Sequence, residues 1–151
     1  MMNYKLFIDT WGLISLYNDK EPYHKPTAEY FDNCINQHYD LFTTNLVISE
    51  FITFRYNHFG HARSKLCVDK LFGNIESGLI RHIVIEESRI KKALELRYKY
   101  HDKPKISFCD LTSMAVMKEF NINEILTMDK HFEQVNMGFE LKPLLERLSA
   151  T

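Results

Sequence analysis

A chain of 151 residues, 45% of them hydrophobic, is long enough for one globular domain that buries about 70% of the surface of its unfolded chain. The formal net charge of -1 and the pI near 6.6 argue against a protein that coats nucleic acid, but not against an enzyme that meets nucleic acid at an acidic, metal-filled site. The three cysteines are odd in number and widely spaced, which excludes a disulfide framework and favours reduced thiols. With neither a secretory signal pattern nor an apolar run that could span a membrane, we expect a cytoplasmic protein.

Apolar runs and helical spacing alternate along the chain, without repeats or a long linker. In chain order, we expect a strand at 4–8, an apolar segment at 11–17, a helix over 22–39, a strand at 40–43, helices over 44–59 and 61–77, a strand at 79–85, a helix over 86–101, a long amphipathic helix opened by Asp110, a strand at 123–127, an edge strand at 139–141 and one or two helical turns over 143–148. Strands separated by helices in this way pair in parallel. The sequence therefore predicts one α/β domain over residues 1–151, a three-layer α/β/α sandwich with a mainly parallel central sheet of four to five strands.

Four acidic residues fall at one edge of this predicted sheet. Asp9 and Asp129 each follow a strand. Asp110 opens the long helix, and Glu50 lies less than two turns into a helix that leaves the same edge. Ligands of open α/β sheets bind beyond the carboxyl ends of the strands, so we expect a site at this edge.

Each aspartate taken singly has another explanation, as the cap of a helix or turn. Asp110 could also complete a capping box with Ser107, because the two form an S-x-x-D pattern. Capping explains Glu50 less well, since its neighbours at helical spacing, Leu46 and Phe54, place it on or beside an apolar stripe, where a carboxylate needs a partner. Nor does capping explain why all four acids converge on one edge.

Four carboxylates in one pocket repel one another unless a cation neutralises them. Hard oxygen ligands of this kind suit Mg²⁺ or Mn²⁺ rather than zinc. Such a site supports phosphodiester hydrolysis, because the metal activates a water and stabilises charge on the leaving oxygen. We expect the hydroxyls of Thr10, Ser107 and Thr127 to support the carboxylates or metal-bound waters, although each fits equally well as a cap or strand-end residue.

The four acidic segments resemble those of a known family. In order they read Phe7-Ile8-Asp9-Thr10, Thr44-Asn45-Leu46-Val47-Ile48-Ser49-Glu50, Ser107-Phe108-Cys109-Asp110 and Thr127-Met128-Asp129-Lys130-His131-Phe132. This order is similar to that of the PIN-domain ribonucleases, the family of the VapC toxins, and the resemblance covers nearly the whole chain. It implies a metal-dependent endoribonuclease in which these four acids bind Mg²⁺ or Mn²⁺ and a metal-activated water cuts RNA to leave a 5′-phosphate. The resemblance also implies a homodimer and, for a toxin, inhibition by a cognate antitoxin peptide.

Residues outside the acidic set are harder to assign. A basic stretch could contact the RNA backbone, although the acids mixed into it also fit a solvated helix face; its candidate contacts are Arg89, Lys92, Lys103 and Lys105. The middle of the chain, 58–105, is rather long for the family, so the surfaces that select RNA and partner cannot be carried over. His131, two residues after Asp129, falls close to the site, but we expect it to be a surface residue of the turn.

Three other functions compete with the ribonuclease. A phosphatase of the haloacid-dehalogenase type would also have an aspartate after its first strand, here Asp9. It is disfavoured because its second aspartate, two residues later, would fall at Trp11. A DNA-directed nuclease could use the same carboxylates. A catalytically quiet binding module could keep the fold, although it would have no reason to keep four carboxylates that repel one another.

Overall fold

The computed structural model describes residues 3–144 as a parallel sheet between two layers of helices. Its elements are β1 (Lys5–Ile8), α1 (Thr10–Leu16), α2 (His24–Asn36), β2 (Asp40–Thr44), α3 (Asn45–His58), α4 (His61–Glu76), β3 (Ile80–Ile83), α5 (Glu87–Lys99), α6 (Phe108–Glu119), β4 (Glu124–Leu126), α7 (His131–Gln134) and β5 (Glu140–Lys142). Among the described residues, no helix has the length and apolar character that a transmembrane segment needs.

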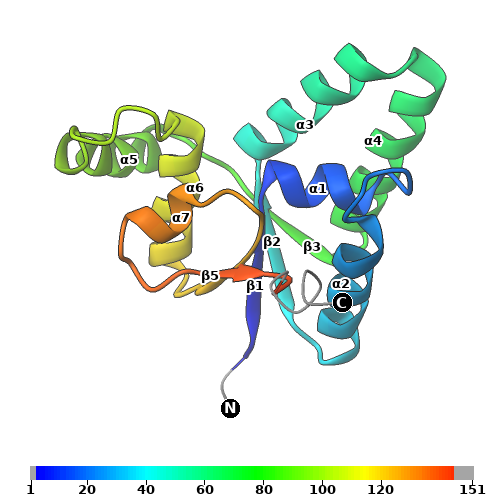
Figure 1. Cartoon of the computed structure of the whole chain (residues 1–151), viewed down its shortest axis with the longest axis horizontal. Helices are drawn as coiled ribbons and strands as arrows, with labels where there is room; N and C mark the ends of the chain where they lie inside the picture. Colours follow the sequence, from blue (N-terminus) through cyan, green and yellow to red (C-terminus); the bar gives the residue numbers. More distant parts are fainter. Residues whose placement is uncertain (1–2, 145–151) are drawn as a thin grey trace.

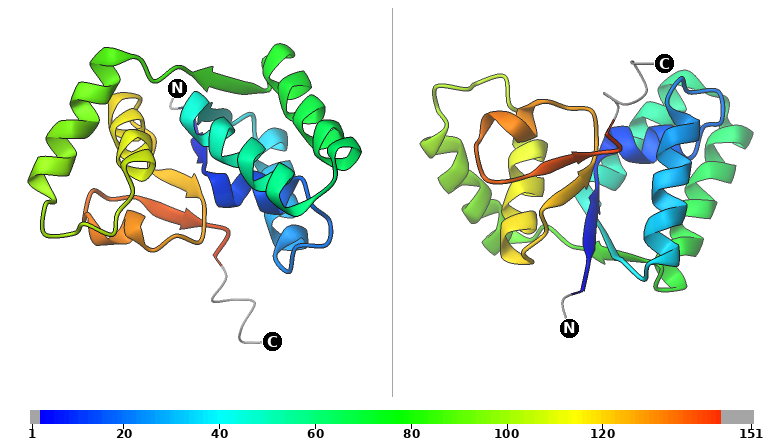
Figure 2. Two further views of the ribbon diagram at one scale, coloured as in Figure 1. Left: turned by 90° about the horizontal axis from the view of Figure 1, so that it is seen from above. Right: turned by 60° about the horizontal axis from the view of Figure 1, so that its bottom comes forward.

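The sheet has five strands in the order β3-β2-β1-β4-β5, and every neighbouring pair is parallel. Helices α1 to α4 lie on one side of the sheet and α5 to α7 on the other (Figure 1), as the two further views also show (Figure 2). The predicted three-layer α/β/α fold is therefore confirmed. Because the chain moves one way across the sheet after β1 and the other way to reach β4, the crevice outside the carboxyl ends of these two strands is the topological switch point.

The central strand β1 is apolar on both faces because helices cover both. Leu6, Phe7 and Ile8 have no exposed surface. Phe7 is in register with Phe42 of β2 and Ile125 of β4, so the apolar run in each strand contributes to the same core. A continuous apolar run, rather than an alternating one, is what a strand inside a parallel sheet requires.

Several element boundaries differ from those predicted, for local reasons. The strand expected at 79–85 is Ile80–Ile83, because the backbone N–H of Ile85 leaves the sheet and donates to Asn45 Oδ1 at 2.6 Å. The helix expected from residue 44 begins at Asn45, since Thr44 is its N-cap and accepts a hydrogen bond from the N–H of Val47. The expected helical turns over 143–148 lie outside the described residues from 145 onward, and residues 143 and 144 are not helical.

Gly12 allows helix α1 to approach strand β4 closely. A Cβ atom at this position would lie 2.5 Å from the carbonyl oxygen of Leu126, a contact that the backbone would have to move to relieve. The pairing of Ile8 with Leu126 places Asp9, the N-cap of α1, next to the end of β4, and the close approach at Gly12 packs α1 against that end. A larger residue at position 12 would therefore push α1 away from the end of β4.

We predict that Gly12→Ala lowers the free energy of unfolding by about 1–3 kcal/mol, the usual cost of overpacking a core. Gly73→Ala is the matched control, because nothing lies within 4 Å of an added Cβ there and the position is inside α4. That variant should gain about 0.5–1 kcal/mol, since alanine is the better helix former. Urea denaturation measures both, and equal effects of the two substitutions would contradict the close-packing account.

Candidate metal centre

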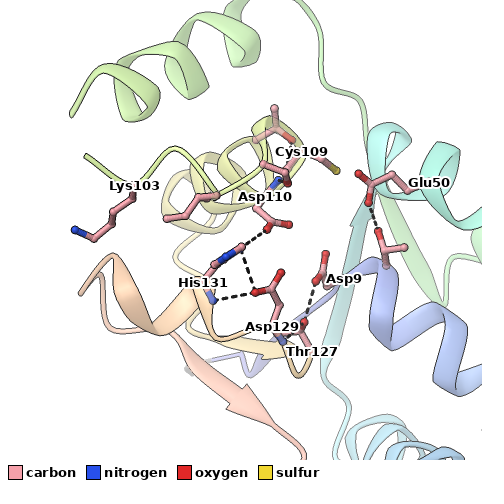
Figure 3. Close-up of polar contacts among 12 residues, drawn as sticks. Asp9, Glu50, Lys103, Cys109, Asp110, Thr127, Asp129 and His131 are labelled. Carbon is pink, nitrogen blue, oxygen red and sulfur yellow. Dashed lines mark hydrogen bonds and ion pairs between the residues drawn. The ribbon is translucent and has the colours of Figure 1, made fainter. Parts of the chain in front are cut away.

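The four predicted acids come from four separate segments and line one open pocket of about 440 Å³ (Figure 3). Asp9 follows β1 and Asp129 follows β4, on the two sides of the switch point. Asp110 lies in the first turn of α6, and Glu50 lies in the second turn of α3. The side chains of Asp9 and Asp110 are largely buried, with 4% and 8% of each residue exposed. The structure thus brings together the residues that the sequence placed at one edge.

Asp110, Asp129 and His131 form the tightest part of this site. The Nδ1 atom of His131 lies 3.3 Å from Asp110 Oδ2 and 3.2 Å from Asp129 Oδ1. The backbone N–H of His131 also donates to Asp129 Oδ1 at 2.9 Å. One oxygen or nitrogen atom from each of the three residues lies within 4.8 Å of the others. Three ligand atoms this close could converge on a single cation.

Thr127 forms hydrogen bonds to both Asp9 and Asp129. Its buried hydroxyl donates to Asp9 Oδ2 at 2.8 Å and accepts a hydrogen bond from the backbone N–H of Asp129 at 3.0 Å. One hydroxyl at the end of β4 therefore orients an acid on each side of the switch point.

Glu50 lies at the opening of the pocket, and its environment differs from the one predicted. The residue is exposed, rather than held on or beside the apolar stripe of α3. Its Oε2 atom accepts a hydrogen bond from the hydroxyl of Thr10 at 2.8 Å. The expectation was wrong because α3 buries Val47 and Phe51 on another face, which leaves Glu50 facing the solvent-filled pocket.

The capping explanation accounts for only part of the acidic set. Asp9 is the N-cap residue of α1, but its side chain makes no capping hydrogen bond. Ser107 caps α6 by accepting the N–H of Asp110 at 3.0 Å, which leaves the carboxylate of Asp110 directed into the pocket. Asp129 alone accepts a backbone N–H of the turn that follows it. The two most buried carboxylates are thus not used as caps.

Burial and mutual repulsion raise the pKa values of the two inner aspartates. Burial, opposed in part by the hydrogen bond from Thr127, raises the pKa of Asp9 to about 6. Burial first, and then the charges of Asp9 and Asp129, raise the pKa of Asp110 to about 8. At neutral pH, and without a cation, the site therefore retains a proton that a bound divalent ion would displace.

The donor set fits a hard divalent cation. Its oxygen ligands come from carboxylates, and the accumulated negative charge is the property that such an ion neutralises. The imidazole of His131 is the one nitrogen ligand in the cluster and also suits transition metals. Mg²⁺ or Mn²⁺ would thus be held by Asp110 and Asp129, with Asp9 and Glu50 on the remaining sides of the pocket.

His131 is the site residue that the sequence analysis missed. We expected a surface position in the turn after Asp129, but the ring lies between Asp110 and Asp129. The turn after β4 leads directly into α7, whose first residue is His131, and this brings the ring back over the aspartates. Its position two residues after an acid at a strand end was the available signal.

None of the four basic residues predicted to contact RNA lines the acidic pocket. The guanidinium of Arg89 donates two hydrogen bonds, at 3.0 and 2.8 Å, to the carboxylate of Glu119. Lys92 lies on α5, 3.8 Å from Glu95. Lys103 pairs with Asp102 and points away from the carboxylates (Figure 3), and Lys105 is exposed on the same loop.

One family model matches the chain, and several solved structures share its fold. The family model for the PIN domain matches residues 6–137. No curated protein matches the chain in sequence.

Similar solved structures include VapC20 of Mycobacterium tuberculosis, described as a toxin that cleaves the sarcin-ricin loop, with 23% identity, a TM-score of 0.72 and coverage of 89% of this chain and 96% of that one. The VapBC2 structure of Rickettsia felis, bound to a DNA fragment from its promoter, has 12% identity, a TM-score of 0.71 and coverage of 91% and 97%. FitAcB of Neisseria gonorrhoeae has 17% identity, a TM-score of 0.64 and coverage of 90% and 95%. At these identities the structures show that the fold is shared.

We predict that the metal-free protein loses stability as the pH rises from about 4 to about 8. Asp9 and Asp110 have an ordinary pKa of 3.8, and the folded protein raises it to about 6 and about 8. The folded state therefore binds more protons than the unfolded state across this range, so the free energy of unfolding falls with increasing pH. Asp110→Asn should flatten the profile between pH 6 and 8, and should exceed the stability of the wild type at pH 8 by on the order of 1 kcal/mol or more. Urea denaturation in EDTA tests this, and parallel profiles for the two proteins would contradict it.

We also predict that Thr127→Val weakens binding of Mn²⁺ by about 10–100-fold, the usual effect of removing a partner that orients metal ligands. Valine keeps the shape of the side chain but removes the hydroxyl that holds both Asp9 and the backbone of Asp129. Thr127→Ser retains that hydroxyl and should restore most of the affinity. Calorimetric titration with Mn²⁺ distinguishes the variants, and wild-type affinity in Thr127→Val would refute the role given to this residue.

Proposed function

Because the chain belongs to the PIN-domain family, we propose that it is a Mg²⁺- or Mn²⁺-dependent endoribonuclease and acts as the toxin of a toxin–antitoxin pair. The observation that carries the proposal is the convergence of four carboxylates, from four segments of the chain, on one open pocket at the switch point of the sheet. A catalytically quiet protein would gain nothing from crowding these charges together, since the repulsion destabilises its fold. A hydrolase gains a cation site from the same arrangement.

Each site residue has a proposed role. Asp110 and Asp129 hold the metal together with His131, whose ring fixes the relative positions of the two carboxylates. When bound, the metal would supply activation of a water and stabilisation of charge on the leaving oxygen. Asp9 and Glu50 complete the acidic lining, and the hydroxyls of Thr127 and Thr10 set the directions of these two carboxylates.

Ser107 acts on the site through the backbone. Its hydroxyl accepts the backbone N–H of Asp110 and so fixes the position of Asp110 in the first turn of α6.

We propose that the loop before Ser107, which carries Lys103 and Lys105, contacts the RNA backbone where the strand enters the site. Arg89 and Lys92 lie near the start of α5, at the opposite end of the helix from this loop, and form ion pairs with Glu119 and Glu95. Any contact that they make with RNA would compete with those ion pairs.

The proposed partners follow from the similar structures. VapC20 is described as a toxin, and VapBC2 as a structure bound to a fragment of promoter DNA. By analogy with these proteins, we propose that a cognate antitoxin binds this chain and blocks the acidic pocket, and that the chain forms a homodimer. Elution of the chain at the volume of a monomer, with or without a candidate antitoxin, would count against both.

We predict that the wild type cleaves RNA in Mg²⁺ or Mn²⁺ but not in EDTA, and that Asp110→Asn lowers this activity by at least about 100-fold. Asp32→Asn is the matched control, because it removes the same charge from an exposed position on α2, outside the pocket. Gel analysis of a pool of structured RNAs, with single-stranded DNA alongside, measures the activity. Equal cleavage by Asp110→Asn and Asp32→Asn would overturn the site assignment, and cleavage of DNA alone would establish the DNA-directed alternative.

A further inference from the structure

A second pocket, of about 310 Å³, lies at the end of α1, whereas the acidic site lies at the start of that helix. Its lining comes from the end of α1 and the loop after it, from the first residue of α2, His24, and from α3 and α4, and includes Arg55, Arg63 and Lys70. The only acid in the lining is Asp19. The formal charge of the lining is therefore +2 with histidine neutral, in a chain whose net charge is -1.

Arg55 is buried in this pocket, and within residues 3–144 no carboxylate forms an ion pair with it. The residue is 2% exposed, and its Nε atom is buried with no hydrogen-bond partner among the described residues. The one hydrogen bond from its guanidinium is long, 3.4 Å from Nη2 to the carbonyl oxygen of Arg63. An arginine is rarely buried unless a carboxylate or another anion compensates its charge.

Two guanidinium groups lie against the same aromatic ring. The Cζ atom of Arg55 lies 3.9 Å from the centre of the Phe59 ring, and that of Arg63 lies 4.8 Å from the same centre. Over residues 3–144, no carboxylate forms an ion pair with Arg55, Arg63 or Lys70. Cations gathered in this way repel one another, so the arrangement is suited to an anion, as the acidic pocket is suited to a cation.

The position of the pocket indicates which anion it takes. Helix α1 begins at the acidic site with Thr10 and ends at the second pocket with Leu16, a length of about 10 Å at 1.5 Å per residue. Helix α3 likewise contributes Glu50 to the first pocket and Arg55 to the second. A polymer with a phosphate on every nucleotide could occupy both pockets at once.

We propose that the pocket formed by Arg55, Arg63 and Lys70 binds a backbone phosphate of the RNA substrate, at a point on the strand away from the bond that is cut. Arg55 forms the base of the site, and the exposed side chains of Arg63 and Lys70 form its rim. The tetrahedral oxygens of a phosphate can accept hydrogen bonds from several cations at once. This inference rests on the proposed function for the identity of the polymer, whereas the preference for an anion rests on the pocket alone.

Inorganic phosphate tests the pocket without any RNA. In EDTA, and at constant ionic strength set with chloride, phosphate should raise the melting temperature of the wild type, because a ligand of the folded state stabilises it. The shift should disappear in Arg63→Gln/Lys70→Gln and persist in Lys91→Gln/Lys118→Gln, which removes the same charge from exposed positions on α5 and α6. Equal shifts in the two double variants, or no shift in the wild type, would overturn the anion site.

Arg55→Met separates a ligand-binding role from a structural one. If the buried guanidinium serves an anion, replacing it with an apolar side chain should raise the melting temperature of the free protein while it removes the response to phosphate. If Arg55 only packs against Phe59, the substitution should lower the melting temperature and leave the response of the other residues intact, which would contradict the proposal.

Binding of a short single-stranded RNA then tests the identity of the ligand. In the Asp110→Asn background with Mg²⁺, Arg63→Gln/Lys70→Gln should weaken the affinity about tenfold, the equivalent of one hydrogen bond to a charged group. The slope of log K against log salt, which is negative, should become less steep by about 0.7, the value for one phosphate contact on a single strand. Unchanged RNA affinity alongside a lost phosphate response would overturn the RNA assignment and indicate an anionic group on a protein partner, for which the exposed Leu66 at the rim would be a contact. Failure of the wild type to cleave RNA would instead overturn the proposed function and would leave the phosphate result unchanged.

Discussion

Carboxylates are both buried and crowded together at the switch point of the sheet, and the surrounding elements have to hold them there. Asp9 and Asp110 are buried, so each loses hydration while it lies close to other acids, and both pKa values rise. A fold tolerates this only if another gain offsets the cost. A divalent cation provides that gain, because it neutralises the charges and takes up their oxygen atoms as ligands.

The surrounding fold holds the acids where repulsion alone would separate them. Parallel strands bring Asp9 and Asp129 to the same edge of the sheet, and because Ile8 of β1 is paired with Leu126 of β4, the next residues, Asp9 and Thr127, are close enough to form a hydrogen bond. His131 then fixes the carboxylates of Asp110 and Asp129 relative to each other. The pocket at the other end of α1 gathers charges of the opposite sign, and Arg55, Arg63 and Lys70 form no ion pair with a carboxylate of residues 3–144.

The fold and the acidic set could be predicted because both follow from local patterns. Apolar runs separated by helical spacing predict parallel strands, and an acid directly after such a run must lie at the carboxyl edge of the sheet. The environment of Glu50 could not be predicted, because helical periodicity does not specify which helix packs against which face. The position of His131 depends on the direction of the turn after β4, and so on tertiary contacts. Arg55 did have a signal, since it lies four residues after Phe51 on the buried stripe of α3.

Proton release on metal binding tests whether a divalent cation neutralises the acidic cluster. Calorimetric titration of Mn²⁺ at pH 7, in two buffers with different ionisation enthalpies, gives the number of protons that leave the protein for each ion bound. Since Asp9 and Asp110 together retain a proton in the absence of metal, we expect a release of about one proton per Mn²⁺. Binding of Mn²⁺ without proton release, or no binding at all, would show that this acidic cluster is not held together by a cation.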